Sequence, residues 1–251
     1  MNLEKVKSLT ELLKARKKIA VLTGAGVSTE AGIPDFQSTD DTWNEETPRV
    51  TAISLSYLRK NPADFWRIYK NVFRSVSGDY EPTSFHRFIA ELEKNHEILV
   101  VTQNIDGLHQ KAGSTNVTEW HGTSETLKCS KRHCGRIYDF KNFLDSNEIP
   151  KCECDGILYP NVVLFGMDVK ATYSDRAFIE TCDLLICAGT SLDVHPANDI
   201  PSVAKSNRQD KSSVTTVWLN RNLPPEGYDF DLVITGELSE IISEANKDQG
   251  L

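Results

Sequence analysis

The sequence has no long hydrophobic run, because charged or polar residues interrupt every apolar stretch. A helix that crosses a bilayer needs about 18 or more largely apolar residues, so we expect no membrane span. The first 20 residues also lack the apolar segment and small-residue cleavage site of a signal peptide. These two absences predict a cytoplasmic protein without a membrane partner.

Positive charge is in deficit as well. The chain has 28 Lys and Arg against 36 Asp and Glu, for a net charge of −8. Nonspecific affinity for nucleic acid comes mainly from cationic side chains, so no nucleic-acid partner is expected. Lysine-rich peptides are easier partners, because the negative charge does not repel them at long range.

The 251 residues, of which 39% are hydrophobic, are enough to bury a substantial core. Short apolar runs predict buried parallel strands, and stretches with helical spacing alternate with them. This alternation predicts an α/β fold, a Rossmann-like parallel sheet with helices on both faces. Ser8 and Glu11 are spaced as a capping box for the first helix. The predicted strands are residues 18–23, 97–102, 116–120, 183–188, 214–219 and 231–234.

Two insertions interrupt this pattern. Residues 37–96 are predicted to be a helical and cofactor-loop insertion, in which residues 37–61 are polar and irregular and form a loop over the crevice. Residues 124–160 break the alternation, carry four cysteines and are predicted to form a small inserted module. The remaining segments, residues 1–36, 97–123 and 161–251, form the Rossmann-like domain.

Three predicted strands end in small or polar residues, at residues 24–29, 102–107 and 119–122. Because the carboxyl ends of parallel strands share one edge of a sheet, these groups predict a ligand crevice there. Among them only His121 titrates near neutral pH, which makes it the first candidate for proton transfer.

The first of these ends, Gly24-Ala25-Gly26, suits close approach of the backbone to a pyrophosphate. Thr29 stands where the usual fingerprint has its third glycine. A tight strand-to-helix turn without a ligand explains this motif alone equally well.

Four of the six cysteines lie in the small module, as C-x4-C followed by C-x-C. In a reducing compartment such cysteines are metal ligands more often than disulfides, and four thiolates in a tetrahedron hold a structural zinc ion. Two alternatives stay open: His133 replaces one of the cysteines as a ligand, or the thiols are reduced and bind no metal. Cys182 and Cys187 are predicted to be buried core residues. The predicted zinc ligands are Cys129, Cys134, Cys152 and Cys154.

Five segments carry motifs that occur together in one family. They are GAGVSTEAGIPDF at residues 24–36, TQNIDGLH at 102–109, HG at 121–122, NVVLFG at 161–166 and GTSL at 189–192. In this order they resemble the sirtuins, NAD-dependent protein lysine deacylases. The short chain is most similar to the bacterial members.

The resemblance implies transfer of an acyl group from lysine to ADP-ribose, with release of nicotinamide and O-acyl-ADP-ribose. NAD is then a co-substrate, zinc is structural, the partners are acylated lysine-containing proteins or peptides, and we expect a monomer. His121 would act as general base on a ribose hydroxyl, a role that contributes about 10² to 10⁴ in rate. Asn104 and Asp106 would bind the ribose and the nicotinamide carboxamide; a hydrogen-bonded Asx turn is their structural alternative.

The resemblance also assigns two binding surfaces. Residues 163–166 would pair as an edge strand with the substrate backbone, although a buried strand is an alternative for this run. The substrate residues are His121, Val163, Leu164, Phe165 and Gly166. The cofactor residues are Gly24, Ala25, Gly26, Ser28, Thr29, Asp35, Phe36, Gln37, Gln103, Asn104, Ile105, Asp106, Gly189, Thr190, Ser191, Asn220 and Arg221.

The chain departs from the family at three positions. Sirtuins usually have Arg, Arg and Glu where this sequence has Gln37, Tyr159 and Met167. Loss of a fixed cation near the cofactor changes its placement or affinity. Two alternatives to deacylation therefore stay open: mono-ADP-ribosyl transfer or NAD hydrolysis, and a noncatalytic NAD-binding sensor.

Overall fold

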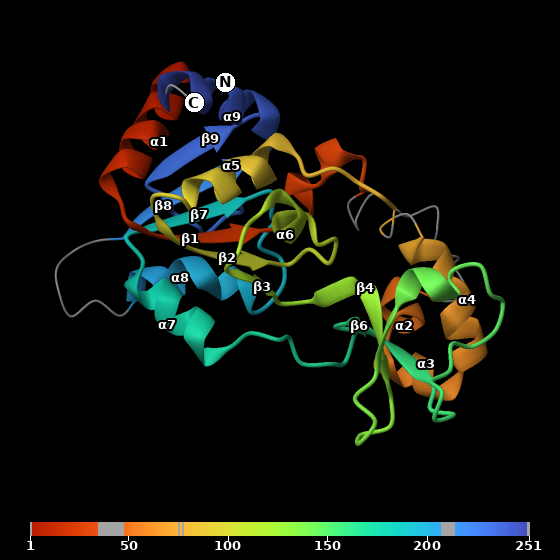
Figure 1. The fold of residues 1–251 in the computed structure, drawn as a ribbon. Coiled ribbons are helices and arrows are strands. Elements are labelled where there is room, and N and C mark those ends of the chain that lie inside the picture. The colour runs from red at the N-terminus through yellow and green to blue at the C-terminus, as the bar shows by residue number, and fades with distance from the viewer. Residues whose placement is uncertain (1, 35–47, 75, 77, 207–213, 250–251) are drawn as a thin grey trace.

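A computed structural model describes residues 2–34, 48–74, 76, 78–206 and 214–249. Its centre is a six-stranded parallel sheet in the order β3-β2-β1-β7-β8-β9 (Figure 1). The strands are β1 Lys18–Thr23, β2 Glu97–Thr102, β3 Val117–Glu119, β7 Leu184–Ala188, β8 Thr215–Asn220 and β9 Leu232–Thr235. The predicted fold class is confirmed, and β1 and β2 have the predicted bounds.

Both faces of this sheet are covered, because alternate residues of each strand enter different cores. On β1, Ile19 and Val21 pack beneath α1, α5 and α9, whereas Ala20 and Leu22 pack on the side of α7 and α8 (Figure 1). A strand buried on both faces must be apolar throughout, as these runs are. The helices are α1 Leu3–Ala15, α5 Ser84–Leu92, α7 Tyr173–Thr181, α8 Ile200–Ser206 and α9 Leu238–Gln249.

The strand register brings the chemical groups to one edge. Thr23 at the end of β1 pairs with Thr102 of β2 on one side and with Ala188 of β7 on the other. The strand order reverses between β1 and β7, so this edge of the sheet contains a topological switch point, where ligands of open α/β sheets bind.

Helix α1 begins earlier than predicted. The side chain of Asn2 accepts a hydrogen bond from the Glu4 amide at 3.1 Å and caps the helix. Ser8 lies inside the helix and donates to the Glu4 carbonyl. The predicted capping box at Ser8 is therefore wrong, because the helix already has a cap six residues upstream.

A second, smaller sheet lies beside the first (Figure 1). It is antiparallel in the order β5-β4-β6, and its apolar face packs against α4 around Trp66, Tyr69 and Phe140. The elements are β4 Gly122–Cys129, β5 Ile137–Asp139, β6 Leu158–Val162, α2 Arg49–Ala52, α3 Leu55–Lys60 and α4 Pro62–Phe73.

Part of the predicted loop over the crevice is helical. From residue 48 onward the chain forms α2 and α3, so the prediction of irregular structure to residue 61 is wrong there. Helix α5, which follows α4 in the same predicted insertion, contributes Phe85 and Ile89 to the core of the large sheet. The division into three units stays a prediction.

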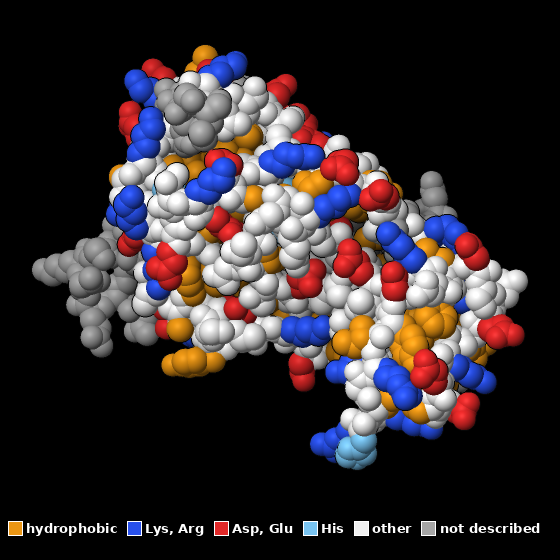
Figure 2. All heavy atoms as spheres, in the orientation of Figure 1, with side chains coloured by type: hydrophobic (Ala, Val, Ile, Leu, Met, Phe, Trp, Pro, Cys, Tyr) orange, Lys and Arg blue, Asp and Glu red, His pale blue; other side chains and the backbone are white. Residues whose placement is uncertain are grey.

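On the face shown in Figure 2, acidic and basic side chains are interspersed without a broad patch of one sign. Across the described residues, none of the helices has the length and apolar character of a bilayer-crossing segment.

Candidate functional site

The glycine turn after β1 is packed directly against the turn after β7. The Gly26 amide donates to the Gly189 carbonyl at 2.8 Å, and a Cβ added at Gly26 would lie 2.7 Å from the Gly189 Cα. Real Cβ atoms do not approach that closely, so glycine is required here by the backbone itself. The turn continues as two short 3-10 helices, Ala25–Val27 and Thr29–Ala31, in which Thr29 Oγ1 donates to the Gly26 carbonyl.

Replacement of Gly189 by alanine is expected to destabilise the protein by about 3 kcal/mol or more. Gly189 has φ +58°, and its added Cβ would lie 2.5 Å from the Val27 amide nitrogen. Gly227→Ala is the matched control, because Gly227 has φ +91° but no atom within 4 Å of an added Cβ, and should cost only about 1 kcal/mol. Urea unfolding measures both, and equal losses would contradict the close packing of the two turns.

The same two turns offer free backbone donors. Among the residues that the structure describes, no acceptor is recorded for the amides of Ala25, Thr190 or Ser191. Clustered unpaired N–H groups at the start of a helical turn bind phosphate oxygens. The residues present therefore fit a dinucleotide pyrophosphate.

A buried polar network joins the β1 turn to the segment after β2. Ser28 Oγ donates to Asp106 Oδ2 at 2.7 Å, and Asn104 Nδ2 donates to Ser28 Oγ at 3.0 Å. Asp106 Oδ1 also accepts the Leu108 amide at 3.0 Å, which is the Asx turn considered above. Burial raises the pKa of the Asp106 carboxyl, although these hydrogen bonds oppose the shift. The turn thus holds the two predicted polar groups in a fixed arrangement with Ser28.

His121 lies in the turn between β3 and β4. Its Nδ1 is 2.8 Å from the Gln103 carbonyl oxygen, and because a carbonyl only accepts, Nδ1 carries the proton. Nε2 is then the unprotonated nitrogen of the neutral ring, and no hydrogen-bond partner for it is found among the described residues of this half-buried side chain. Burial lowers the pKa of His121, with the Gln103 hydrogen bond opposing. The ring is therefore held at the end of β2 with Nε2 as its proton acceptor.

Two further strand ends converge on this position. Thr190 Oγ1 donates to Gln103 Oε1 at 2.8 Å, and Asn220 Nδ2 donates to the Thr190 carbonyl at 2.7 Å. Arg221 is exposed and pairs with Glu237 at 2.9 Å. Gln103, Thr190 and Asn220, three of the predicted cofactor residues, therefore link the ends of β2, β7 and β8.

The predicted substrate segment lies directly beside His121. The Val163 amide donates to the His121 carbonyl at 2.7 Å. On its other side, the Phe165 amide donates to Ile53, and its carbonyl accepts from the Leu55 amide. Regular strand β6 ends before this segment, at Val162. Residues 163–166 therefore bridge the His121 turn and the start of α3.

Three predicted cofactor residues, Asp35, Phe36 and Gln37, lie outside the described residues. One residue near the site was missed. Asp175, only 4% exposed, accepts hydrogen bonds from Trp120 Nε1 and Thr118 Oγ1, both at 3.0 Å. It thereby holds the strand that leads to His121. Its one sequence signal, the Thr172-x-x-Asp175 capping box, marks the start of α7 and does not reveal the contact with Trp120.

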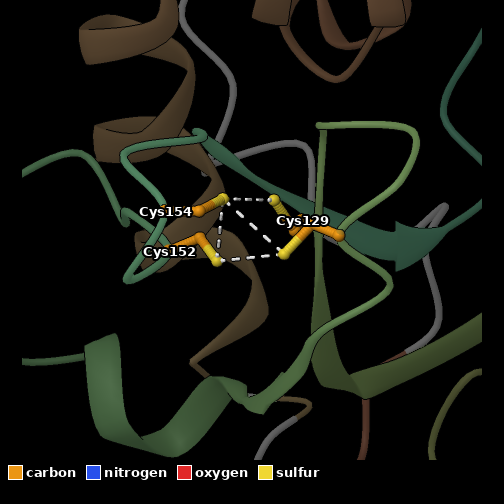
Figure 3. Close-up of side chains that lie close together, drawn as sticks. Cys129, Cys152 and Cys154 are labelled. Carbon is orange, nitrogen blue, oxygen red and sulfur yellow. Dashed lines mark hydrogen bonds between the residues drawn. The ribbon is translucent and has the colours of Figure 1, made fainter.

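The four predicted metal ligands come together in the small module (Figure 3). Cys152 and Cys154, from the turn before β6, face Cys129 at the end of β4, and all four ligand atoms lie within 4.8 Å of one another. The Sγ–Sγ distances of 3.4 Å to 3.6 Å approach the value of about 3.8 Å set by tetrahedral zinc–thiolate bonds of about 2.3 Å. His133 is exposed and is not part of the cluster.

The thiols differ in their surroundings. The backbone amide of Cys154 and the Tyr138 hydroxyl lower the pKa of Cys152 to about 6. Outside the cluster, Cys182 and Cys187 are fully buried as predicted, and burial raises the pKa of Cys187. Four reduced, closely spaced sulfurs therefore fit a structural zinc ion, and the other two cysteines belong to the core.

A glycine turn with unpaired amides at the switch point of a parallel sheet, followed by a histidine held as a proton acceptor, is the arrangement expected of a dinucleotide-dependent enzyme. Residues 24–196 match the model of the Sir2 family, and the chain belongs to this family. Its fold and its predicted family are thus both confirmed.

Relatives match over nearly the whole chain. NAD-dependent protein deacetylase 2 of Geobacillus kaustophilus (strain HTA426) is 40% identical over 248 residues, which cover 98% of each protein. The NAD-dependent protein deacetylase of Bacillus subtilis (strain 168) is 38% identical and covers 94% of this chain and 96% of its own. A solved Sir2 structure with a p53 peptide and NAD+ has a TM-score of 0.80 at 28% identity, with 98% of both chains covered.

Proposed function

We propose that the protein is an NAD-dependent protein deacetylase that transfers the acyl group of acylated lysine to ADP-ribose and releases nicotinamide and O-acyl-ADP-ribose. The observation that carries this proposal is the orientation of His121: the Gln103 carbonyl holds Nδ1 and leaves Nε2 as the proton acceptor. Gln103 directly precedes Asn104 of the Ser28–Asn104–Asp106 network. The full-length similarity to NAD-dependent protein deacetylases supports the same activity.

His121 is proposed to remove the proton from a ribose hydroxyl of the co-substrate. The Gln103 carbonyl fixes the tautomer that leaves Nε2 as acceptor. Since burial lowers the pKa of this ring, the neutral form dominates at neutral pH. A positioned base of this kind contributes about 10² to 10⁴ in rate.

The other predicted site residues are proposed to bind and orient. The amides of Ala25, Thr190 and Ser191 would hold the phosphates, and Asn104 with Asp106 would fix the ribose and the carboxamide. An amide oxygen is a weak nucleophile, so the acyl-lysine must be held in contact with the reacting carbon, which is worth several kcal/mol. NAD supplies the reactive glycosidic bond when bound.

The substrate peptide is proposed to lie along residues 163–166. Both backbone groups of Phe165 already pair with neighbours, whereas the Leu164 and Gly166 amides have no recorded acceptor among the described residues. Main-chain bonds at these two amides would give affinity with little sequence selectivity. Phe165 and Met167 are 42% and 40% exposed and would contact residues that flank the acyl-lysine.

Incubation with NAD and an acetylated peptide tests the proposal, with nicotinamide release as the measurement. We expect release that requires the acetyl group and yields a deacetylated peptide. Release that is independent of the acetyl group would instead support ADP-ribosyl transfer or hydrolysis. Binding of NAD without any release would support a sensor. A cytoplasmic location and a monomeric state stay predictions from the sequence. Size-exclusion chromatography with light scattering can test the monomeric state.

A further inference from the structure

We infer that Tyr138 and Arg136 hold the Cys152 thiolate by hydrogen bonds and slow the loss of zinc from the four-cysteine cluster. The inference concerns the metal module alone and does not depend on the proposed deacetylase activity. It concerns the pair with the C-x-C spacing, Cys152 and Cys154, whose sulfurs lie 3.4 Å apart within one tight turn.

The direction of the Tyr138 hydrogen bond follows from its neighbours. Tyr138 Oη lies 3.2 Å from Cys152 Sγ and accepts the Glu153 amide at 3.3 Å. The hydroxyl proton is therefore free to point at the sulfur. A zinc-bound thiolate has no proton of its own, so the hydroxyl must be the donor.

Arg136 adds a permanent positive charge on the same side. Its Nη1 lies 3.9 Å from both Cys134 Sγ and Cys152 Sγ, and its Nε lies 3.8 Å from Glu153 Oε2. Four thiolates around one divalent ion leave a net charge of −2, which a guanidinium stabilises. Glu153 thus orients Arg136 through its carboxylate and Tyr138 through its amide.

The support is unequal among the four ligands. Within the described part of the chain, no side chain outside the cluster donates to the sulfur of Cys129 or Cys154; Lys131 reaches only the Cys154 carbonyl. Cys152 alone receives both a hydroxyl and a guanidinium donor. Partners of metal ligands typically change metal affinity by about 10- to 100-fold when removed.

The test measures zinc release to a chromogenic chelator from intact protein. Tyr138→Phe removes only the hydroxyl and keeps the ring that packs edge-on against Phe143 at 6.1 Å. We expect it to release zinc about 10-fold faster, and the double variant with Arg136→Gln to release it faster still. Tyr159→Phe and Arg132→Gln, on the same module but without a recorded cysteine contact, are the matched controls.

Zinc content after purification gives a second readout. Reduced zinc in Tyr138→Phe, with about one zinc per chain in Tyr159→Phe, would support the inference even if release is too fast to time. Release rates and zinc contents of Tyr138→Phe and Arg136→Gln that equal those of their controls would overturn it. Circular dichroism at the assay temperature identifies a variant that has unfolded, and the Arg136→Gln comparison then decides.

Discussion

Replacement of His121 by alanine is expected to lower acetyl-peptide turnover by about 10² to 10⁴. The imidazole is held at Nδ1 by the Gln103 carbonyl, which leaves Nε2 as the proton acceptor. His109 also reaches this edge of the sheet, but it is only 1% exposed and its Nε2 lies 3.1 Å from Thr23 Oγ1 at the end of β1. Alanine leaves neither a base nor an ordered replacement. The measurement is the steady-state rate of peptide deacetylation at saturating NAD.

His133→Ala serves as the control, because His133 is exposed on the small module and has no proposed part in the chemistry. It should keep the parent rate. The His121 variant should keep its secondary structure and zinc content, because alanine removes only the side-chain contact with the Gln103 carbonyl and keeps the backbone bond to Val163. A His121→Ala rate within about 10-fold of the parent would remove the residue from the proposed role.

The pH dependence should follow the same group. Burial lowers the pKa of His121 below the ordinary value of 6.5, and a base acts only when it is unprotonated. We therefore expect kcat/KM to fall as pH drops, with its midpoint below pH 6.5, and to change little from there to neutrality. The folded state disfavours the charged ring, so this group also lowers stability as pH falls below 6.5. A midpoint above pH 6.5 would contradict the burial argument.

The sheet could be predicted because each of its central strands is buried on both faces. A run such as Leu184–Ala188 must then be apolar at every position, a pattern that sequence shows directly. The polar residues at three strand ends are predicted to share one edge because parallel strands have their carboxyl ends on the same side. In the observed register Thr102 pairs with Thr23 on one side and with Glu119 on the other.

The helices between residues 48 and 61 could not be predicted because they are short. Helix α3 has only six residues, Leu55–Lys60, and its N-cap Ser54 accepts a hydrogen bond from the Tyr57 amide. Its sequence signal is therefore one cap and not a periodic apolar stripe. The next helix follows at once, because Pro62 occupies the first turn of α4, where a missing N–H costs nothing.

Tertiary contacts account for the remaining differences. From the sequence, the glycines at residues 24 and 26 fit both the approach of a pyrophosphate and a tight turn without a ligand. The structure shows that the Gly189 backbone by itself requires them. Asp175 lies 55 residues from Trp120 along the chain, so no local pattern reports their hydrogen bond. Both cases depend on segments that meet only after the sheet has formed.

Removal of one zinc ligand is expected to abolish metal binding and unfold the small module. Structural zinc supplies an apparent binding free energy of about 10 to 16 kcal/mol in small domains, and the module has a three-stranded sheet whose core includes Cys129 and Cys152 themselves. In Cys129→Ser, elemental analysis should find far less than the expected one zinc per chain. Hydrogen exchange should lose protection in β4, β5 and β6 while β1 and β7 keep theirs.

Cys187→Ala is the matched control. Cys187 is also buried, but it belongs to the core of the parallel sheet and not to the core that contains Cys129 and Cys152. It should keep its zinc, whatever its loss of packing. β4 begins directly after His121, and β6 leads into residues 163–166. Unfolding of the module would therefore also disturb the pairing of Val163 with His121 in the proposed substrate segment. Cys129→Ser should therefore lose peptide turnover more completely than NAD binding, which depends on the strand ends of the large sheet. Full zinc content in Cys129→Ser would refute the four-thiolate site.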